Sequence, residues 1–134
     1  MAKKYQHSDF DIDFGRNDFI NDVSVKYDKN AIRQSIMNII LTRKGEKPFN
    51  RSFGVGVHDL LFENMSPIRN AKLERDIINE VRTREPRASV QSVVVNEEDM
   101  DKNILELTVN YLIAGGAAAN PIAQSLRIEL KKVR

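Results

Sequence analysis

Acidic residues near the N-terminus suggest a first kind of chemistry, calcium binding. In the stretch DFDIDFG, Asp9, Asp11 and Asp13 alternate as the first three ligands of a calcium-binding loop do. The rest of that loop is missing, because Phe14 stands where it requires glycine and Ile20 where it requires a bidentate glutamate. We therefore interpret the stretch as acidic surface and predict no metal site there.

Two other patterns also lack the partners that their chemistry needs. Gly54-Val55-Gly56 is not a dinucleotide-binding loop, because Asp59 takes the place of the third glycine and no core strand precedes it. His7 and His58 have no ligand partner at helical spacing, and the chain has no cysteine. We expect neither a cofactor nor a metal ion.

Carboxylate catalysis is the remaining enzymatic possibility. A glycosidase needs two carboxyl groups across a cleft, one of them with a raised pKa. The candidates are Glu46, Glu63, Glu74 and Glu85. Most of them have lysine or arginine nearby, and a basic neighbour lowers the pKa of a carboxyl group. No G-x-S-x-G nucleophile motif occurs either, so the residues predict a protein that is not an enzyme.

The tripeptide Glu85-Pro86-Arg87 offers binding chemistry instead. Pro86 ends the preceding helix, because proline disfavours the helical conformation at Glu85. A glutamate near a helix C-terminus is disfavoured by the helix dipole, which suggests that Glu85 has a partner. Arg87 carries a planar set of donors suited to a carboxylate, and Pro86 would hold both charges outward in a preset geometry. The residues alone leave open whether these charges are plain surface or a binding site.

Composition places the chain among soluble globular proteins with one core. It has 134 residues, of which 41% are hydrophobic and 30% charged. A formal net charge of +2 with scattered basic residues is too small to indicate nucleic acid or an anionic membrane. No apolar run approaches the roughly 20 residues that span a bilayer, and the N-terminus has no apolar core of signal-peptide type. We expect a protein made and used inside a cell, without nucleic-acid or membrane partners.

The first half of the chain predicts an arm followed by helices. Residues 1–22 mix aromatic residues with aspartates without any period, so we expect an extended arm that docks on another surface. Residues 22–28 alternate weakly and predict a short strand. Residues 30–45 predict a helix with Asn30 as N-cap and Gly45 as its stop. Its apolar stripe consists of Ile32, Ile36, Ile39 and Ile40.

Two further helices are expected before the sheet. Residues 57–65 predict a short helix whose apolar side carries Val57, Leu60 and Leu61. A third helix opens at Ser66-Pro67, and its apolar stripe consists of Leu73, Ile77 and Val81. In the loop between the first two helices, we expect Phe49 and Phe53 to fold back on the core.

After Pro86 the hydrophobic period changes to two. Residues 88–99, 104–113 and 122–133 predict three strands with short turn-rich links, which is typical of an antiparallel meander. The predicted fold class is α+β, with about three helices packed on a small, mainly antiparallel sheet of three to four strands. We expect residues 23–134 to form this single domain.

Several motifs at fixed intervals resemble one known family. The shared elements are Arg43-Lys44-Gly45, Lys47-Pro48-Phe49, Phe53-Gly54, Leu61-Phe62-Glu63 and Glu85-Pro86-Arg87. In this pattern the chain resembles the baseplate wedge and sheath-initiator proteins of contractile-tailed bacteriophages of the T-even type. Relatives occur in type VI secretion baseplates and phage-tail-like particles. The resemblance covers residues 30–134, and nothing carries over to the first two dozen residues.

The resemblance implies a structural protein of the inner baseplate in the virion tail, assembled in the host cytoplasm. It implies wedge proteins, the tail sheath protein, and tail tube or tube-initiating hub proteins as partners. By the same resemblance, Glu85, Pro86 and Arg87 would contact the wedge, with Lys47, Pro48 and Phe49 in a loop beside that contact. Some relatives are labelled lysozymes, so a baseplate-associated peptidoglycan hydrolase stays the alternative.

The last predicted strand is the element expected to meet the sheath. By the resemblance, it would exchange strands with neighbouring subunits, and a terminal strand can lie at a sheet edge where another chain pairs with it. The strand residues assigned to this pairing are Leu126, Arg127, Ile128, Glu129, Leu130 and Lys131. The alternative interpretation is a plain edge strand whose charges protect it from nonspecific pairing.

Overall fold

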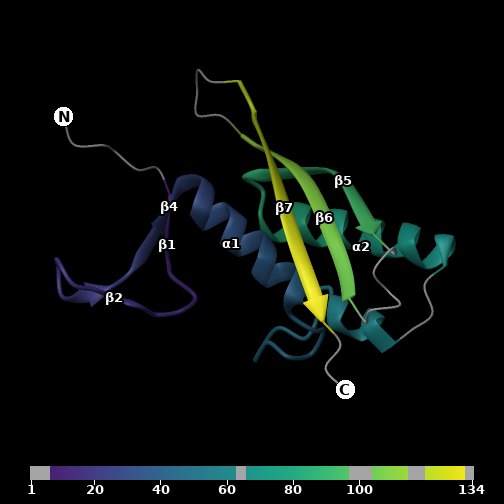
Figure 1. The fold of residues 1–134 in the computed structure, drawn as a ribbon, viewed down its shortest axis with the longest axis horizontal. Helices are drawn as coiled ribbons and strands as arrows, with labels where there is room; N and C mark the ends of the chain where they lie inside the picture. Colours follow the sequence, from purple (N-terminus) through teal and green to yellow (C-terminus); the bar gives the residue numbers. More distant parts are fainter. Residues whose placement is uncertain (1–6, 63–65, 97–103, 115–119, 132–134) are drawn as a thin grey trace.

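Helices and a sheet follow one another in the order that the sequence predicts (Figure 1). This computed structural model describes residues 7–62, 66–96, 104–114 and 120–131. Within these residues, the helices are α1 (Asp28–Leu41), the 3₁₀ helix η1 (Val57–Phe62) and α2 (Pro67–Arg84). The α+β class is confirmed. The expected count of about three helices differs in detail, because η1 is a 3₁₀ helix rather than an α-helix.

The sheet is a three-stranded antiparallel meander. Its strands are β5 (Ala88–Asn96), β6 (Ile104–Ile113) and β7 (Ile122–Lys131), paired in the order β5-β6-β7. The ladder between β6 and β7 is continuous over the full length of both strands, whereas the ladder between β5 and β6 shifts register between Val90 and Ser92. The predicted meander is therefore confirmed, with β7 at one edge and β5 at the other.

Alternation along the strands separates a core face from a polar face. In β6, every second residue from Leu105 to Ile113 is buried, and in β7 the buried residues are Leu126, Ile128 and Leu130. Helices α1 and α2 pass behind the sheet in Figure 1 and cover this face. Each large apolar side chain removed from water here contributes about 1.5–3 kcal/mol, so the sheet and both helices depend on one shared core.

Helix α1 has the expected core stripe but different ends. Ile32, Ile36, Ile39 and Ile40 are buried as predicted. The helix begins at Asp28 rather than after Asn30, and Thr42, not Gly45, is its C-cap. The early start follows from the strand before it, since Asp28 exchanges hydrogen bonds with His7: its N–H donates to the His7 carbonyl (2.9 Å), and its Oδ1 accepts from the His7 N–H (3.1 Å).

Helix α2 follows the prediction closely. The hydroxyl of Ser66 accepts a hydrogen bond from the Arg69 N–H (3.4 Å), and Pro67 occupies the first turn. The helix ends at Arg84 with Glu85 as its C-cap, one residue before Pro86. Its buried residues are Leu73, Ile77 and Val81.

The N-terminal segment is folded into a narrow hairpin rather than a single extended strand. Strand β1 (Ser8–Phe10) pairs with β4 (Val25–Tyr27), and β2 (Arg16–Asn17) pairs with β3 (Asp22–Val23). We call residues 7–27 the arm. It lies at one end of the molecule and is joined to the body through α1 (Figure 1). The boundary predicted near residue 22 therefore falls inside this hairpin.

The loop between α1 and η1 is held by tight backbone turns. Phe53 packs partly buried against the core, as expected, but the prediction for Phe49 is wrong because its side chain is fully exposed. Phe49 has a φ of 62°, in the left-handed region that non-glycine residues adopt mainly in tight turns. Leu60 and Leu61 of η1 pack against the core as predicted. None of the described helices is long and apolar enough to cross a membrane.

Gly54 is the position in this loop where a side chain cannot be placed. A Cβ there would lie 2.2 Å from the Thr42 carbonyl oxygen, and the φ of Gly54 is +98°. Gly45 has a similar φ of +89°, but a Cβ there would meet nothing within 4 Å. Substitution of Gly45 therefore tests the strain of a positive φ alone, whereas substitution of Gly54 adds a steric overlap with Thr42.

We expect Gly54→Ala to lower the free energy of unfolding by about 3 kcal/mol or more, because the loop backbone must move away from Thr42. Gly45→Ala should cost only about 1–2 kcal/mol, which is the strain of a left-handed alanine. Urea denaturation of both variants measures the difference. Equal losses in the two variants would show that the close approach at Gly54 is unimportant.

Candidate protein-binding site

The turn between α2 and β5 contains the tripeptide Glu85-Pro86-Arg87. The Glu85 N–H donates to the Val81 carbonyl (2.7 Å), and the Ala88 N–H donates to the Glu85 carbonyl (3.1 Å). The Arg87 carbonyl accepts from the N–H of Ala114 (2.9 Å), directly after β6. Backbone bonds thus fix the tripeptide to the helix before it and to the middle strand of the sheet.

Glu85 and Arg87 form a two-point ion pair. Arg87 donates from Nε to Oε1 and from one terminal nitrogen to Oε2 of Glu85, each at 2.5 Å. Glu85 is only 2% exposed, whereas the Arg87 side chain is 37% exposed. Our expectation that both charges project outward is therefore wrong for Glu85: its carboxylate faces inward, and Pro86 and Arg87 form the accessible part of the turn.

The ion pair controls the ionisation of both groups. Burial alone would raise the pKa of Glu85, but hydrogen bonds from Arg87 and Ser35, together with the charge of Arg87, lower that pKa below its usual 4.5. The pKa of Arg87 is raised, mainly by its bond to Glu85 and also by the charge of Asp9. Both groups are therefore charged at neutral pH, and Glu85 is linked to α1 through Ser35.

A groove beside this turn collects residues from four separate segments. It has a volume of about 530 Å³ and lies between the arm, α1, the loop after α1 and the end of α2. We call it the arm–loop groove. Its lining residues are Asp9, Ile12, Ser35, Asn38, Ile39, Thr42, Glu46, Lys47, Phe53 and Arg84. An apolar lining of isoleucine and phenylalanine among charges of both signs suits a protein segment better than a small anion or cation.

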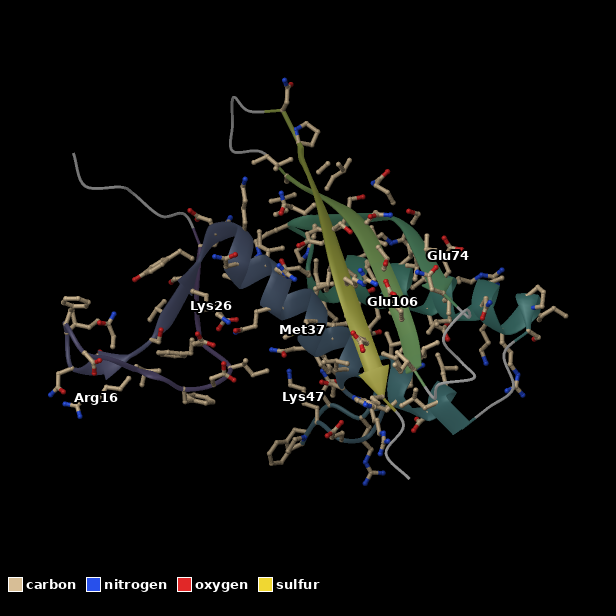
Figure 2. The ribbon with its side chains drawn as sticks, viewed as in Figure 1. Arg16, Lys26, Met37, Lys47, Glu74 and Glu106 are labelled. Carbon is tan, nitrogen blue, oxygen red and sulfur yellow. The ribbon has the colours of Figure 1, made fainter. Side chains whose placement is uncertain are left out.

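Contacts between the loop and α2 bring Lys47 to the same region as the tripeptide. The Lys47 Nζ lies 4.1 Å from the centre of the Phe53 ring, and the Arg84 guanidinium lies 5.6 Å from it. Glu80 Oε1 accepts from Arg84 Nε and from the Gly54 N–H, both at 3.1 Å. The motif loop is thus bound to the helix turn that leads into Glu85. Figure 2 shows Lys47 below α1, with the exposed Pro48 and Phe49 following in the same loop.

Strand β7, the other predicted contact, lies at the opposite edge of the sheet. Leu126, Ile128 and Leu130 are buried against the helices, so they are core residues. Arg127, Glu129 and Lys131 are exposed on the other face, and Arg127 donates to Glu106 Oε2 of β6 (2.6 Å). The structure therefore does not unite β7 with the Glu85 turn, and pairing on β7 would depend on its backbone and its exposed charges.

Three residues of this site were missed by sequence reasoning. Ser35 and Asp9 act on the ion pair from α1 and from the arm, and Glu80 joins the loop to α2. Each lies far along the chain from the group on which it acts, so no local spacing reveals the interaction. Across the described part of the chain, no three acidic or histidine side chains gather as metal ligands would.

We expect Glu85→Gln to lower the free energy of unfolding by about 1.5–3 kcal/mol near neutral pH, because a charged hydrogen-bonded pair is lost. The folded-state pKa of Glu85 is lowered, so its stabilising effect is complete above pH 4.5 and is lost as the pH falls through the folded-state value. Urea denaturation at neutral and acidic pH should show the difference from the natural chain shrinking in acid. The exposed Glu129→Gln is the control, and a pH-independent difference for Glu85→Gln would contradict the assignment.

The sequence of this chain matches a known protein family. The baseplate wedge protein gp25 family matches residues 26–117. The baseplate wedge protein gp25 of Enterobacteria phage T4 is 40% identical over 90 residues, which is 67% of this chain and 66% of that protein. The match therefore spans just under two thirds of the relative's length.

Two solved structures share the fold at low sequence identity. A protein of Geobacter sulfurreducens described as a proposed tail lysozyme has a TM-score of 0.60 and 22% identity, with 79% of this chain and 94% of that chain covered. A chain of the sixfold-symmetrised anti-feeding prophage baseplate has a TM-score of 0.60 and 21% identity, with 90% of this chain and 83% of that chain covered. Below 25% identity these likenesses establish the fold, whereas the family match establishes descent. This chain belongs to the gp25 family of baseplate wedge proteins.

Proposed function

We propose that this chain is a structural subunit of the inner baseplate of a contractile tail. It binds wedge proteins through Glu85-Pro86-Arg87 and supports the first disc of sheath through β7. One observation carries the wedge contact: an ion pair with the buried Glu85 holds the accessible Arg87 in one geometry, next to Pro86 and beside the arm–loop groove, in a chain of this family.

Arg87 has the properties of a contact residue that is ordered in advance. A guanidinium has five N–H donors, and the bonds to Glu85 use two of them. Because these bonds hold the side chain, less rotamer entropy is lost when a partner binds. Glu85 serves as the positioning residue of the tripeptide, and Pro86 adds an exposed ring. Lys47, Pro48 and Phe49 extend the same surface along the motif loop.

Strand β7 supplies the second proposed contact. It is an edge strand of the sheet, and an edge strand can pair with an added strand from another chain. Its exposed face alternates Arg127, Glu129 and Lys131, a pattern that a partner strand can match in charge. The plain alternative is that these charges only protect the edge from nonspecific pairing.

The proposed partners are wedge proteins, the tail sheath protein, and tail tube or tube-initiating hub proteins. The proposed place is the baseplate of the virion tail, with assembly in the host cytoplasm. A protein of the same fold in a sixfold-symmetrised baseplate is consistent with copies of this chain repeated around an axis. Such a baseplate would offer the sheath a ring of β7 edges at regular spacing.

A hydrolase function has less support, although one protein of the same fold is described as a proposed tail lysozyme. A general acid requires a carboxyl group with a raised pKa, whereas the pKa of Glu85 is lowered. Glu63, the other carboxylate of the family motifs, lies outside the described residues. We therefore propose a structural role without catalysis.

We expect Arg87→Ala to fold with reduced stability and to lose at least about tenfold in wedge binding, because the exposed donors are gone. Removal of Arg87 leaves Glu85 buried without its cation, so the double variant Glu85→Gln/Arg87→Ala is included. Co-purification with wedge proteins measures binding, and circular dichroism checks the fold. Arg82→Ala, on the exposed side of α2, is the matched control. Wild-type recovery of the folded double variant would refute the wedge contact.

Reversing the exposed charges of β7 tests the sheath contact while keeping the core. Deletion of residues 127–134 is unsuitable because it removes the buried Ile128 and Leu130. We expect the triple variant Arg127→Glu/Glu129→Lys/Lys131→Glu to fold, because all three side chains are exposed and position 129, which would carry a lysine, lies directly opposite Glu106 and can replace the pairing that Glu106 makes with Arg127.

Baseplates and tubes carrying the triple variant should lack sheath in electron micrographs. Charge reversal at the exposed Lys29 and Arg82 is the control, and those particles should be sheathed. Normal sheath on the β7 variant would exclude charge-matched pairing at this edge.

A further inference from the structure

The arm exposes an unusual number of large apolar side chains. The exposed residues of this segment are Phe10 (62%), Ile12 (45%), Phe14 (71%), Phe19 (99%) and Ile20 (63%). Scattered single apolar residues are normal on a surface, but a gathering within one short segment marks an interaction site. The turn at the tip, residues 18–21, carries the most exposed of them, Phe19.

The arm presents these side chains on an ordered backbone. Gln34 of α1 is buried and holds the base of the arm: its Nε2 donates to the Phe10 carbonyl (2.6 Å), and its Oε1 accepts from the Ile12 N–H (3.1 Å). Lys26 and Asp11 form an ion pair at 3.0 Å across the hairpin. At the tip, the Asn21 N–H donates to the Asn17 carbonyl (2.8 Å). Because this backbone is already ordered, the arm loses less conformational entropy when it binds a partner.

The charges of the arm indicate a basic partner. Residues 7–27 contain five aspartates and two basic residues, although the whole chain has a net charge of +2. The rest of the chain is therefore basic. Its basic residues include four that are exposed on α2, namely Arg69, Lys72, Arg75 and Arg82.

A pocket at the start of α2 combines an apolar wall with two exposed basic side chains. It has a volume of about 360 Å³, near the lower end of the roughly 300–1,000 Å³ of small-ligand pockets, and so suits one or two side chains. We call it the α2 pocket. Its apolar wall is Val55, Leu60 and Leu73. Lys72 and Arg69 line it together with Asp76 and Asp59, and Asp59 is paired with Arg43 at 3.2 Å.

The arm tip and the α2 pocket lie at opposite ends of the molecule. Figure 2 labels Arg16 near the arm tip at one end and Glu74, in the helical segment that lines the pocket, toward the other. Because the base of the arm is bound to α1, the tip does not reach the pocket of its own chain. Contact between the two surfaces therefore requires a second copy.

We propose that the arm tip of one copy inserts Phe19 into the α2 pocket of a second copy, with Asp18 beside Lys72. A contact between two different surfaces runs head to tail, and it closes into a ring where the rotation between copies permits. This arrangement rests on the proposed function, since a baseplate repeats its wedge around an axis. A contact of this size is far smaller than a stable interface of roughly 1,200–2,000 Å², so it is weak between free molecules and strengthened by the ring.

The absence of natural cysteine allows the contact to be trapped directly. Ile20→Cys on one population and Asp76→Cys on another, the latter with a size tag, are mixed under mild oxidation, and Asp76 is chosen because it lines the pocket one helical turn from Lys72 and leaves that lysine in place. Disulfide-linked heterodimers are measured by non-reducing electrophoresis. We expect them to form at least about fivefold faster than with Ser125→Cys, an exposed control on the sheet, because docking raises the local thiol concentration.

Replacing Phe19 with Ser in the Ile20→Cys chain should reduce the yield to the Ser125→Cys level, and high salt should slow trapping because the contact pairs opposite charges. Equal trapping with Asp76→Cys and Ser125→Cys overturns the proposal, as does trapping that persists without Phe19. The experiment uses this chain alone, so its failure leaves the wedge contact of Arg87 unaffected. Loss of wedge binding in the Arg87 variants likewise does not predict its result.

Discussion

A buried carboxylate that must keep its charge is the constraint on which this structure depends. Glu85 is removed from water at the point where α2 ends, and an unpaired charge there would be strongly destabilising. Arg87 compensates it from the turn just before β5, and Ser35 does so from α1. The same three residues bring together the first helix, the second helix and the sheet. The geometry of the accessible Pro86 and Arg87 thus follows from the need to pair the buried charge of Glu85.

The remaining surface is divided by the sheet. One edge begins at the Glu85 turn, beside a groove shared by the arm, α1 and the motif loop. The other edge is β7, whose apolar side chains belong to the core and whose charged side chains face away from it. Because the two regions are separated by β6, two different partners can occupy them without competing for space. That separation is what a subunit joining one layer of an assembly to the next requires.

How far the sequence predicts this structure depends on where each residue's partner lies. The stripe Leu73, Ile77 and Val81 and the cap Ser66 are local patterns, and both helix and cap appear where expected. The alternation in β7 likewise predicts its two faces. The burial of Glu85 is not predictable, since Ser35 lies about 50 residues earlier in the chain. The arm itself was expected, but its pairing into a hairpin was not, because strands of two or three residues are too short to give a hydrophobic period. Phe49 was expected in the core, yet its side chain is exposed.

The unbroken ladder between β6 and β7 has a mechanical consequence. Its pairs run from Ile104 opposite Lys131 to Ile113 opposite Ile122 without a shift. A pull along the strand axis loads all of these hydrogen bonds in shear, so they must yield together, whereas a pull across the sheet opens them one after another like a zipper. A strand added to the free edge of β7 would be aligned with that axis. At the sheath contact proposed above, tension along that strand would reach the domain in the direction in which it resists best.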